Sequence, residues 1–163
     1  MLKYLTGNPE CELLPMVSGD CRDVASLHAL RFPLPWGQGE FASLLSQDSV
    51  FGFVMRQTNA WAGKPLVGFV LSREAAGEGE ILTIAVSEKV GRLGLGWRLM
   101  QAALNETRLR GAEAMFLEVD SANSPAIALY RKLGFDKVGE RPAYYTAQDG
   151  TRSTALVMRC NLG

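Results

Sequence analysis

The chain has 163 residues, and its 17 basic and 17 acidic side chains balance to a formal net charge of zero. This balance excludes the strong positive field with which proteins attract a phosphate backbone, so we expect no direct contact with nucleic acid. The length predicts a single domain over residues 1–163, large enough to bury most of the apolar surface of the unfolded chain.

Cysteine and histidine usage bears on the cellular compartment and on metal binding. The three cysteines are far apart and odd in number, and His28 is the only histidine. This pattern predicts neither a disulfide framework nor a metal site, and it is typical of the reducing cytoplasm. The first residues lack a signal core, and no apolar run approaches the length of a membrane span. We therefore expect a soluble cytoplasmic protein that has no membrane contact.

In the first half, the pattern predicts two helices among four strands. The first helix begins near Asp20 and stops before Pro33 and Pro35, and the second covers residues 40–45. The buried face of the first helix is expected to consist of Val24, Leu27 and Leu30. The expected strands cover residues 12–17, 50–55, 66–71 and 81–86. The last three of these strands are expected to form an antiparallel meander.

In the second half, two further helices alternate with strands. A helix after the turn at Gly94 has the buried stripe Leu95, Leu99, Met100, Ala103 and Leu104. It is expected to end at Gly111, after two arginines. The next helix starts at Asn123 or Ser124, has Pro125 in its first turn and is ended by Gly134. The remaining strands are expected at 115–119, 135–138 and 155–158, with a hairpin near 149–150.

The segment from Ile84 to Trp97 combines an apolar strand, a glycine turn and the start of an amphipathic helix. Such a turn lets backbone N–H groups and the positive end of the helix converge on a phosphate. The sequence after Gly96 excludes a GxxxxGK[ST] phosphate loop, and Leu99 takes the place of the last glycine of a dinucleotide fingerprint. Two readings remain: a pyrophosphate held by main-chain amides and Arg92, or a purely structural turn.

Residues 116–135, FLEVDSANSPAIALYRKLGF, resemble the second hallmark block of the GNAT superfamily of acetyl-CoA-dependent N-acetyltransferases, and within it the RimI group. The likeness extends to FPLPW at 32–36, RPAYY at 141–145 and Asp-Gly at 149–150. The resemblance implies an α/β (α+β) GNAT fold, with a mixed, mostly antiparallel sheet of about seven strands and about four flanking helices. It also implies that two central strands splay apart at an acetyl-CoA site. The expected acceptor is the N-terminal α-amine of a protein, a small-subunit ribosomal protein with an N-terminal alanine.

The resemblance also carries two catalytic roles. Glu118, near the end of its strand, matches the general base, and partial burial there would suit that role. Tyr130, in the following helix, matches the general acid that protonates the departing thiolate. Taken without the resemblance, Glu118 reads as a solvated carboxylate at a strand end, and Tyr130 as a core tyrosine with a satisfied hydroxyl.

By the same resemblance, the coenzyme is held by the strand backbone, the glycine turn and two residues downstream. The expected coenzyme-binding residues are Ile84, Ala85, Val86, Arg92, Leu93, Gly94, Leu95, Gly96, Trp97, Asn123 and Tyr130. Asn123 suits an ordinary helix N-cap equally well. Gly91 stands where many relatives have Gln or Arg, so we expect coenzyme binding to be weakened at most, and not lost.

The acceptor is expected to contact Trp36, Tyr144 and Tyr145. The alternatives are that the tyrosines pack along an edge strand and that Trp36 covers the core beneath a loop. Thr146 replaces a proline that is common after the tyrosine pair, which affects the expected hairpin shape. An α-amine has a pKa near 8, against about 10.4 for lysine, so it needs about 3 kcal/mol less to lose its proton. A single glutamate therefore suits an N-terminal amine better.

Two other functions are compatible with these features. A GNAT enzyme acting on a small-molecule amine or on lysine would share the coenzyme half of the sequence. A non-catalytic acyl-CoA sensor would keep the pocket but has no need of Glu118 and Tyr130. We expect no metal, and we expect a monomer or a weak homodimer.

Overall fold

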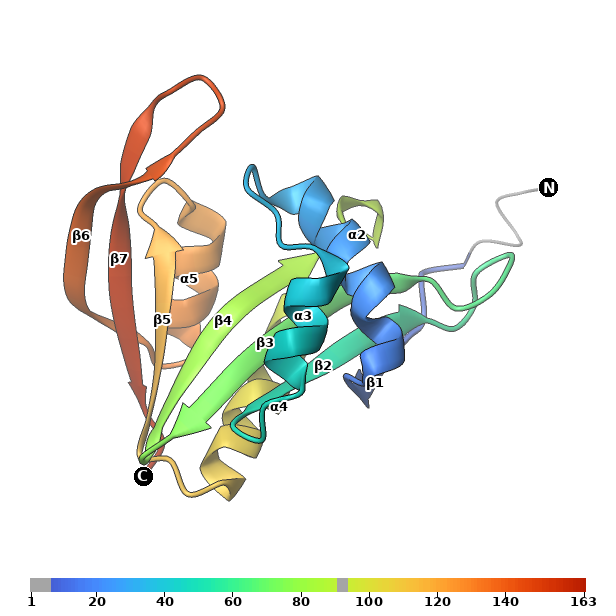
Figure 1. The fold of residues 1–163 in the computed structure, drawn as a ribbon, viewed down its shortest axis with the longest axis horizontal. Coiled ribbons are helices and arrows are strands. Elements are labelled where there is room, and N and C mark those ends of the chain that lie inside the picture. The colour runs from blue at the N-terminus through green and yellow to red at the C-terminus, as the bar shows by residue number, and fades with distance from the viewer. Residues whose placement is uncertain (1–6, 91–93) are drawn as a thin grey trace. The chain divides into compact units, whose positions relative to one another are not determined.

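The computed structural model describes residues 7–90 and 94–163, and within them seven strands form one sheet in the order β1-β2-β3-β4-β5-β7-β6 (Figure 1). The helices and strands are β1 (Cys11–Pro15), η1 (Ser18–Asp20), α2 (Cys21–Arg31), α3 (Gln38–Leu45), β2 (Val50–Gln57), β3 (Leu66–Ala75), β4 (Glu78–Val86), η2 (Glu88–Val90), α4 (Leu95–Leu109), β5 (Ala114–Asp120), α5 (Ser124–Lys132), β6 (Asp136–Thr146) and β7 (Arg152–Asn161). Strands β4 and β5 are parallel, whereas β1–β2, β5–β7 and β6–β7 are antiparallel. The predicted mixed sheet with four α-helices is therefore confirmed.

The described chain divides into two compact units. The first contains the residues up to Leu71 together with Thr83–Ala103, and the second contains Ser72–Leu82 together with Leu104–Gly163. None of the helices in the described ranges is long and apolar enough to cross a bilayer.

In the first unit, α2 is stopped as predicted, because Phe32 takes an extended conformation ahead of Pro33. The prediction that Leu30 belongs to the buried face is wrong, since Leu30 is 76% exposed. The predicted burial of Val24 and Leu27 is confirmed, and His28 is buried in place of Leu30. At about 100° per residue, positions 24, 27 and 28 together span about 100° of the helix surface, and position 30 lies about 60° beyond position 27, outside this buried face.

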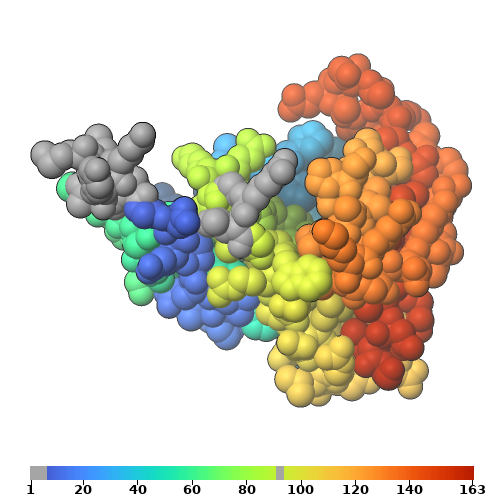
Figure 2. Space-filling view, turned by 180° about the vertical axis from the view of Figure 1, so that it is seen from behind, coloured from blue at the N-terminus to red at the C-terminus, as the bar shows by residue number. Residues whose placement is uncertain are grey.

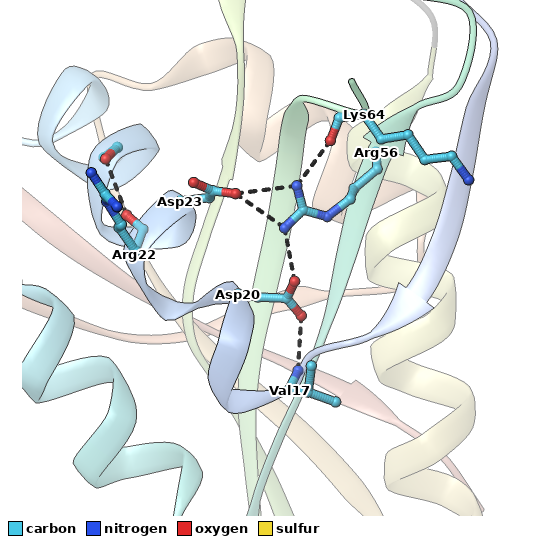
Figure 3. A network of polar contacts seen from close by, with 7 residues as sticks. Val17, Asp20, Arg22, Asp23, Arg56 and Lys64 are labelled. Carbon is cyan, nitrogen blue, oxygen red and sulfur yellow. Dashed lines mark hydrogen bonds and ion pairs between the residues drawn. The ribbon is translucent and has the colours of Figure 1, made fainter. Parts of the chain in front are cut away.

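A network of charged groups fixes the start of α2 in the first unit (Figure 3). Asp20 accepts hydrogen bonds from the Val17 amide at 2.9 Å and from Arg56 Nη2 of β2 at 2.8 Å. Arg56 also donates to Asp23 Oδ2 at 3.2 Å and to the Lys64 carbonyl at 2.9 Å. The network thus ties the first turn of α2 to β2 and to the loop that follows it.

Helix α4 buries the predicted stripe of Leu95, Leu99, Met100, Ala103 and Leu104. In the first unit it approaches β3 closely: a Cβ on Gly68 would lie 3.0 Å from the Leu99 Cδ1 atom. As predicted, the helix ends just before Gly111, whose φ of +92° is in the left-handed region.

Strands β3 and β4 are longer than expected. They continue to the two-residue turn Ala76-Gly77, in which both residues have positive φ, at 53° and 84°. A turn of this kind matches the twist of an antiparallel hairpin. The extension was not predicted from the sequence, because the added parts of both strands contain charged residues. Strands with one exposed face tolerate such residues.

The second unit is built on β5, which lies between β4 and β7 in the sheet. Its ladder with β4 covers Glu78–Glu80 against Ala114–Phe116 and ends there. Its ladder with β7 covers the whole strand, from Ala114 opposite Asn161 to Asp120 opposite Ala155. The C-terminal half of β5, which carries Glu118, is therefore held by β7.

Strand β6 differs most from its prediction, because it runs over Asp136–Thr146 rather than ending at residue 138. Its pairing with β7 is irregular: three residues lie between Arg141 and Tyr145, but only one lies between their partners Ala155 and Ser153. Ala143, inside this bulge, has a φ of 53°. The tip of the β6–β7 hairpin projects beyond α5 (Figure 2).

Candidate active site

In the first unit, the second half of β4 and the start of α4 carry the residues expected to hold the coenzyme. Along β4 the side chains alternate: Thr83 and Ala85 are buried, and Ile84 and Val86 are half-buried. The strand pairing continues past β4, because the Ser87 amide donates to the Val67 carbonyl at 2.8 Å. The expected role of Ile84 and Val86 depends on their main-chain groups, so their side chains do not test it.

The glycine turn leads into α4 as the sequence indicates. Gly94 has a φ of +70°, and a Cβ at this position would meet nothing within 4 Å. The Arg98 amide donates to the Gly94 carbonyl at 3.1 Å, which makes Leu95, Gly96 and Trp97 the first residues of the helix. Amides in this position have no carbonyl partner within their own helix and form the positive end of its dipole. They suit an anion.

Three residues of the expected coenzyme loop lie outside the described residues. They are Gly91, Arg92 and Leu93. The roles predicted for Arg92 and Leu93, and the effect predicted for Gly91, stay predictions.

In the second unit, Glu118 lies on β5 opposite Val157 of β7. Arg141, on β6, reaches it from the far side of β7: its Nη2 atom is 3.1 Å from Glu118 Oε1. The Glu118 side chain is 28% exposed and that of Arg141 is 56% exposed. The carboxylate is therefore accessible to solvent on one side and held by a cation on the other.

The tyrosine pair follows Arg141 across the bulge in β6. The two rings are edge-to-face, with their centroids 5.2 Å apart, and the Arg141 guanidinium lies 5.3 Å from the centroid of Tyr144. Tyr144 is 53% exposed, whereas Tyr145 is half-buried. Tyr144 lies inside the bulge and Tyr145 resumes the pairing, opposite Ser153, so the bulge determines the directions of both side chains.

Electrostatic effects connect Tyr145, Glu118 and Tyr130 within this unit. Burial raises the pKa of Tyr145 to about 12, and the negative charge of Glu118 acts in the same direction. Burial also raises the pKa of Tyr130 to about 12, with a smaller contribution from Tyr145. Tyr130 is buried and packs edge-to-face against Phe135, with 6.0 Å between the centroids. It therefore keeps its proton at neutral pH, as a general acid must.

Asn123 is the N-cap of α5, as one of its two predicted readings required. Its Oδ1 atom accepts a hydrogen bond from the Ala126 amide at 3.3 Å. This leaves the side-chain NH₂ to donate elsewhere. A coenzyme contact by Asn123 stays a prediction.

Trp36 lies in the first unit, half-buried after the loop that follows α2. Its amide donates to His28 Nδ1 at 3.1 Å, and the two rings stack with 5.3 Å between centroids. The indole thus packs on a buried side chain, as the alternative prediction, that Trp36 covers the core beneath a loop, requires.

No role for Arg141 or His28 was predicted from the sequence. Arg141 stood in the RPAYY block without a function, and its ion pair depends on a register across two strand pairings. His28 was noted only as the single histidine. Within the described residues, no group of three or more His, Cys, Asp or Glu side chains is placed to hold a metal ion.

Comparison with known proteins identifies the class of protein. Residues 21–135 match the model of the Acetyltransferase (GNAT) family. The [ribosomal protein bS18]-alanine N-acetyltransferase of Escherichia coli K12 is 33% identical over 124 residues, which are 76% of this chain and 79% of the relative. The chain therefore belongs to the GNAT acetyltransferase family, and it is an N-acetyltransferase.

Solved structures agree with this assignment. The crystal structure of the ribosomal-protein-S18-alanine N-acetyltransferase from Escherichia coli has a TM-score of 0.83 and 27% identity, covering 94% of this chain and 95% of that one. Arabidopsis thaliana NAA60, solved in complex with acetyl-CoA, has a TM-score of 0.82 at 18% identity, covering 94% and 99% of the two chains. At 18% identity, the second comparison supports only the fold of this chain. NAA60 itself, which has this fold, was solved with acetyl-CoA bound.

Proposed function

We propose that this enzyme uses acetyl-CoA to acetylate the N-terminal α-amine of a protein, and that its acceptor is a ribosomal protein with an N-terminal alanine. The observation that carries the proposal is the cluster in the second unit. There, Glu118 is paired with Arg141, and its negative charge contributes to the raised pKa of Tyr145. Tyr145 in turn contributes to the raised pKa of Tyr130. Strand β5, helix α5 and strand β6 thus carry the residues that we propose as the base, the proton donor and the aromatic pair. The 33% identity to an enzyme named for an alanine acceptor favours this acceptor class.

The first unit fits the coenzyme by its main chain. Acetyl-CoA would supply an acetyl thioester and a pyrophosphate. The open space at Gly94 and the leading amides of Leu95, Gly96 and Trp97 suit the pyrophosphate, with Arg92 as its cation. The main-chain groups of Ile84, Ala85 and Val86 would hold the pantetheine arm. The coenzyme contact predicted for Asn123, in the second unit, is part of the same proposal.

The second unit would carry the proton transfers. A carboxylate oxygen of Glu118 would take one proton from the α-ammonium group, whose pKa near 8 makes that removal inexpensive. Arg141 would keep this carboxylate in place through its contact with Oε1. The Tyr130 hydroxyl, whose pKa of about 12 keeps it protonated, would give its proton to the sulfur as the nitrogen–carbon bond forms and the carbon–sulfur bond breaks. The second proton that the nitrogen then releases would restore the Tyr130 hydroxyl. Tyr144 and Tyr145 would contact the first residues of the acceptor. A contact by Trp36, which belongs to the first unit, is a separate part of the proposal.

We also infer that residues 1–163 form one catalytic domain that acts in the cytoplasm as a monomer or weak homodimer, without a nucleic-acid partner. The continuous family match over residues 21–135 supports the single domain. Sedimentation of the purified chain over a range of concentrations tests the assembly state, and a stable larger oligomer would contradict it.

The test is acetylation of a peptide copying the N-terminus of the ribosomal protein, followed by mass spectrometry. The control peptide has a blocked N-terminus and an internal lysine. We expect transfer to the free α-amine and little to the control. Preferential acetylation of lysine, polyamines or aminoglycosides would refute the acceptor assignment, and coenzyme binding without any turnover would favour a sensor.

Two variants test the assigned residues. Glu118→Gln and Tyr130→Phe should each lower kcat by about 10²- to 10⁴-fold, the range for loss of a general base or acid. Glu113→Gln, a change at an exposed residue just before β5, is the matched control and should leave kcat unchanged. Full activity of the Glu118→Gln, Tyr130→Phe double variant would rule out both roles.

A further inference from the structure

We propose that His28 is a positioning residue that fixes the loop from Phe32 to Trp36 for acceptor binding. The inference rests on the proposed function in one respect only, the assignment of Trp36 to the acceptor. His28 is 2% exposed, and the mechanism above makes no use of it. A buried histidine with a defined hydrogen-bond partner therefore needs another explanation.

His28 binds both ends of this loop. Its carbonyl accepts a hydrogen bond from the Phe32 amide at 3.0 Å, which closes α2. Its Nδ1 atom accepts one from the Trp36 amide at 3.1 Å. The loop interior, Pro33-Leu34-Pro35, offers little to hold it, because proline has no N–H and Leu34 is 83% exposed.

The imidazole also lies between the aromatic rings of the loop and the core. It stacks on Phe32 with 4.1 Å between centroids and on Trp36 with 5.3 Å. It meets Phe41 of α3 edge-on at 5.3 Å, and Phe41 packs edge-to-face on Phe69 of β3 at 5.7 Å. Phe41 and Phe69 are fully buried, so this stack ties an exposed loop to the centre of the first unit.

The charge state of His28 is compatible with this role. Burial lowers the pKa of His28, while Glu40 of α3 acts in the opposite direction. Glu40 itself accepts a hydrogen bond from the Gly37 amide at 3.3 Å, and Arg31, on the same helix as His28, is paired with Glu88. The neutral imidazole, with its proton on Nε2, can accept from Trp36, whereas the imidazolium would oppose one donor to another.

A loop held in this way does not need to be ordered when the acceptor binds. Without the anchor, the ordering cost falls on acceptor binding, which raises the KM for the acceptor and leaves the chemical step unchanged. A purely structural role for His28 predicts a different result, namely a loss of stability with no selective effect on the KM for the peptide.

Two substitutions separate the hydrogen bond from the ring. His28→Phe keeps an aromatic ring but removes the acceptor, and His28→Asn keeps an acceptor oxygen near the position of Nδ1 but removes the ring. We expect His28→Phe to raise the KM for the peptide about tenfold, the size of one lost hydrogen bond, with kcat and the KM for acetyl-CoA unchanged. His28→Asn should restore part of the loss. Arg22→Met, an exposed change at the other end of α2, is the control.

The unmodified protein gives a second readout that is independent of activity and of any variant's folding. Because the chain has one histidine, ¹⁵N-histidine labelling gives a single pair of ring-nitrogen signals. We expect the Nε2-protonated tautomer and slow exchange of the Trp36 amide. A proton on Nδ1 would overturn the anchor, and an unchanged peptide KM in His28→Phe would overturn its role in acceptor binding. Absence of peptide acetylation by the native enzyme would refute the proposed function and this acceptor role together, while the tautomer would still decide the anchor.

Discussion

Replacing Arg56 by methionine should cost this protein much of its stability. The Arg56 side chain is 17% exposed and that of Asp20 is 12% exposed, so their 2.8 Å contact is largely shielded from water. Burial by itself lowers the pKa of Arg56, but the hydrogen bonds and charges of Asp20 and Asp23 together outweigh it and raise the pKa. The ion pair is therefore a net attraction in its own environment.

The magnitude follows from the contacts that would be lost. A charge-assisted hydrogen bond to a mostly buried carboxylate is worth about 1.5 to 3 kcal/mol. The contact with Asp23, whose side chain is 53% exposed, adds less than about 1 kcal/mol. Asp20 would then remain mostly buried with the Val17 amide and no cation, which adds to the cost. We expect Arg56→Met to lower the free energy of unfolding by about 3 kcal/mol.

Urea unfolding followed by circular dichroism at pH 7 measures this change directly. Arg22→Met, which removes an exposed arginine from α2, the helix that the network anchors, should change the free energy of unfolding by less than about 0.5 kcal/mol. In a cycle with Asp20→Asn, the coupling between positions 20 and 56 should be about 1 to 3 kcal/mol. If Arg56→Met costs no more than Arg22→Met, the network carries no net stabilisation and the reasoning is wrong.

Three further predictions concern the packing and titration of single groups. Tyr130 and Tyr145 have pKa values of about 12 in the folded chain against 10 when unfolded, so the folded state keeps protons that the unfolded state loses. Their stabilisation is complete below pH 10 and declines between pH 10 and 12, and Tyr130→Phe should reduce the decline by about 2 to 3 kcal/mol in urea titrations. Gly79→Ala would place a Cβ 2.3 Å from Thr107 Cγ2 and 2.5 Å from Met115 Sδ, and should cost about 1 to 3 kcal/mol in thermal unfolding. Gly39→Ala, which meets nothing within 4 Å, is its control and should cost nothing. Thr83→Val should leave stability unchanged or raise it by up to about 1 kcal/mol, because the buried Thr83 hydroxyl has no hydrogen-bond partner among the described residues; a clear loss would show that it has one.

The elements that could be predicted from the sequence are those with a local cause. Helix α5 begins where Asn123 can accept a hydrogen bond from the Ala126 amide, and it ends before Gly134, which has a φ of +97°. The buried stripe of α4 repeats at helical spacing and was predicted residue by residue. The part of strand β6 beyond residue 138 could not be predicted in this way, because its residues are mostly exposed and include a proline and a bulge. Strand β6 forms because β7 supplies its pairing partners, which lie from 6 residues (Thr146 to Arg152) to 23 residues (Asp136 to Arg159) further along the chain.

The same distinction holds for the candidate site. Glu118 and Tyr130 lie in one continuous motif, and the resemblance named both. The contact between Glu118 and Arg141 depends on two register relations through β7, which no local pattern encodes. The hydrogen bond from Trp36 to His28 spans only eight residues, yet it requires the conformation of a proline-containing loop. Its sequence signal was a lone histidine on the buried side of a helix, which is more often a core residue than a positioning one.

The residues proposed to contact the acceptor share one structural property within their separate units. Trp36 ends an irregular loop whose two ends bind to His28. Tyr144 lies inside a bulge in which Ala143 has a φ of 53°, and Tyr145 directly follows that bulge. Arg141, at the start of that bulge, contacts both Glu118 and the Tyr144 ring. Irregular backbone of this kind is determined by its anchors and not by its own propensity. Changing the anchors should therefore alter which acceptor is bound, and at His28 it should do so without altering the proton transfers assigned to Glu118 and Tyr130. Arg141 differs from His28, because its contact with the carboxylate links acceptor positioning to the base, and substitution there should change KM and kcat together.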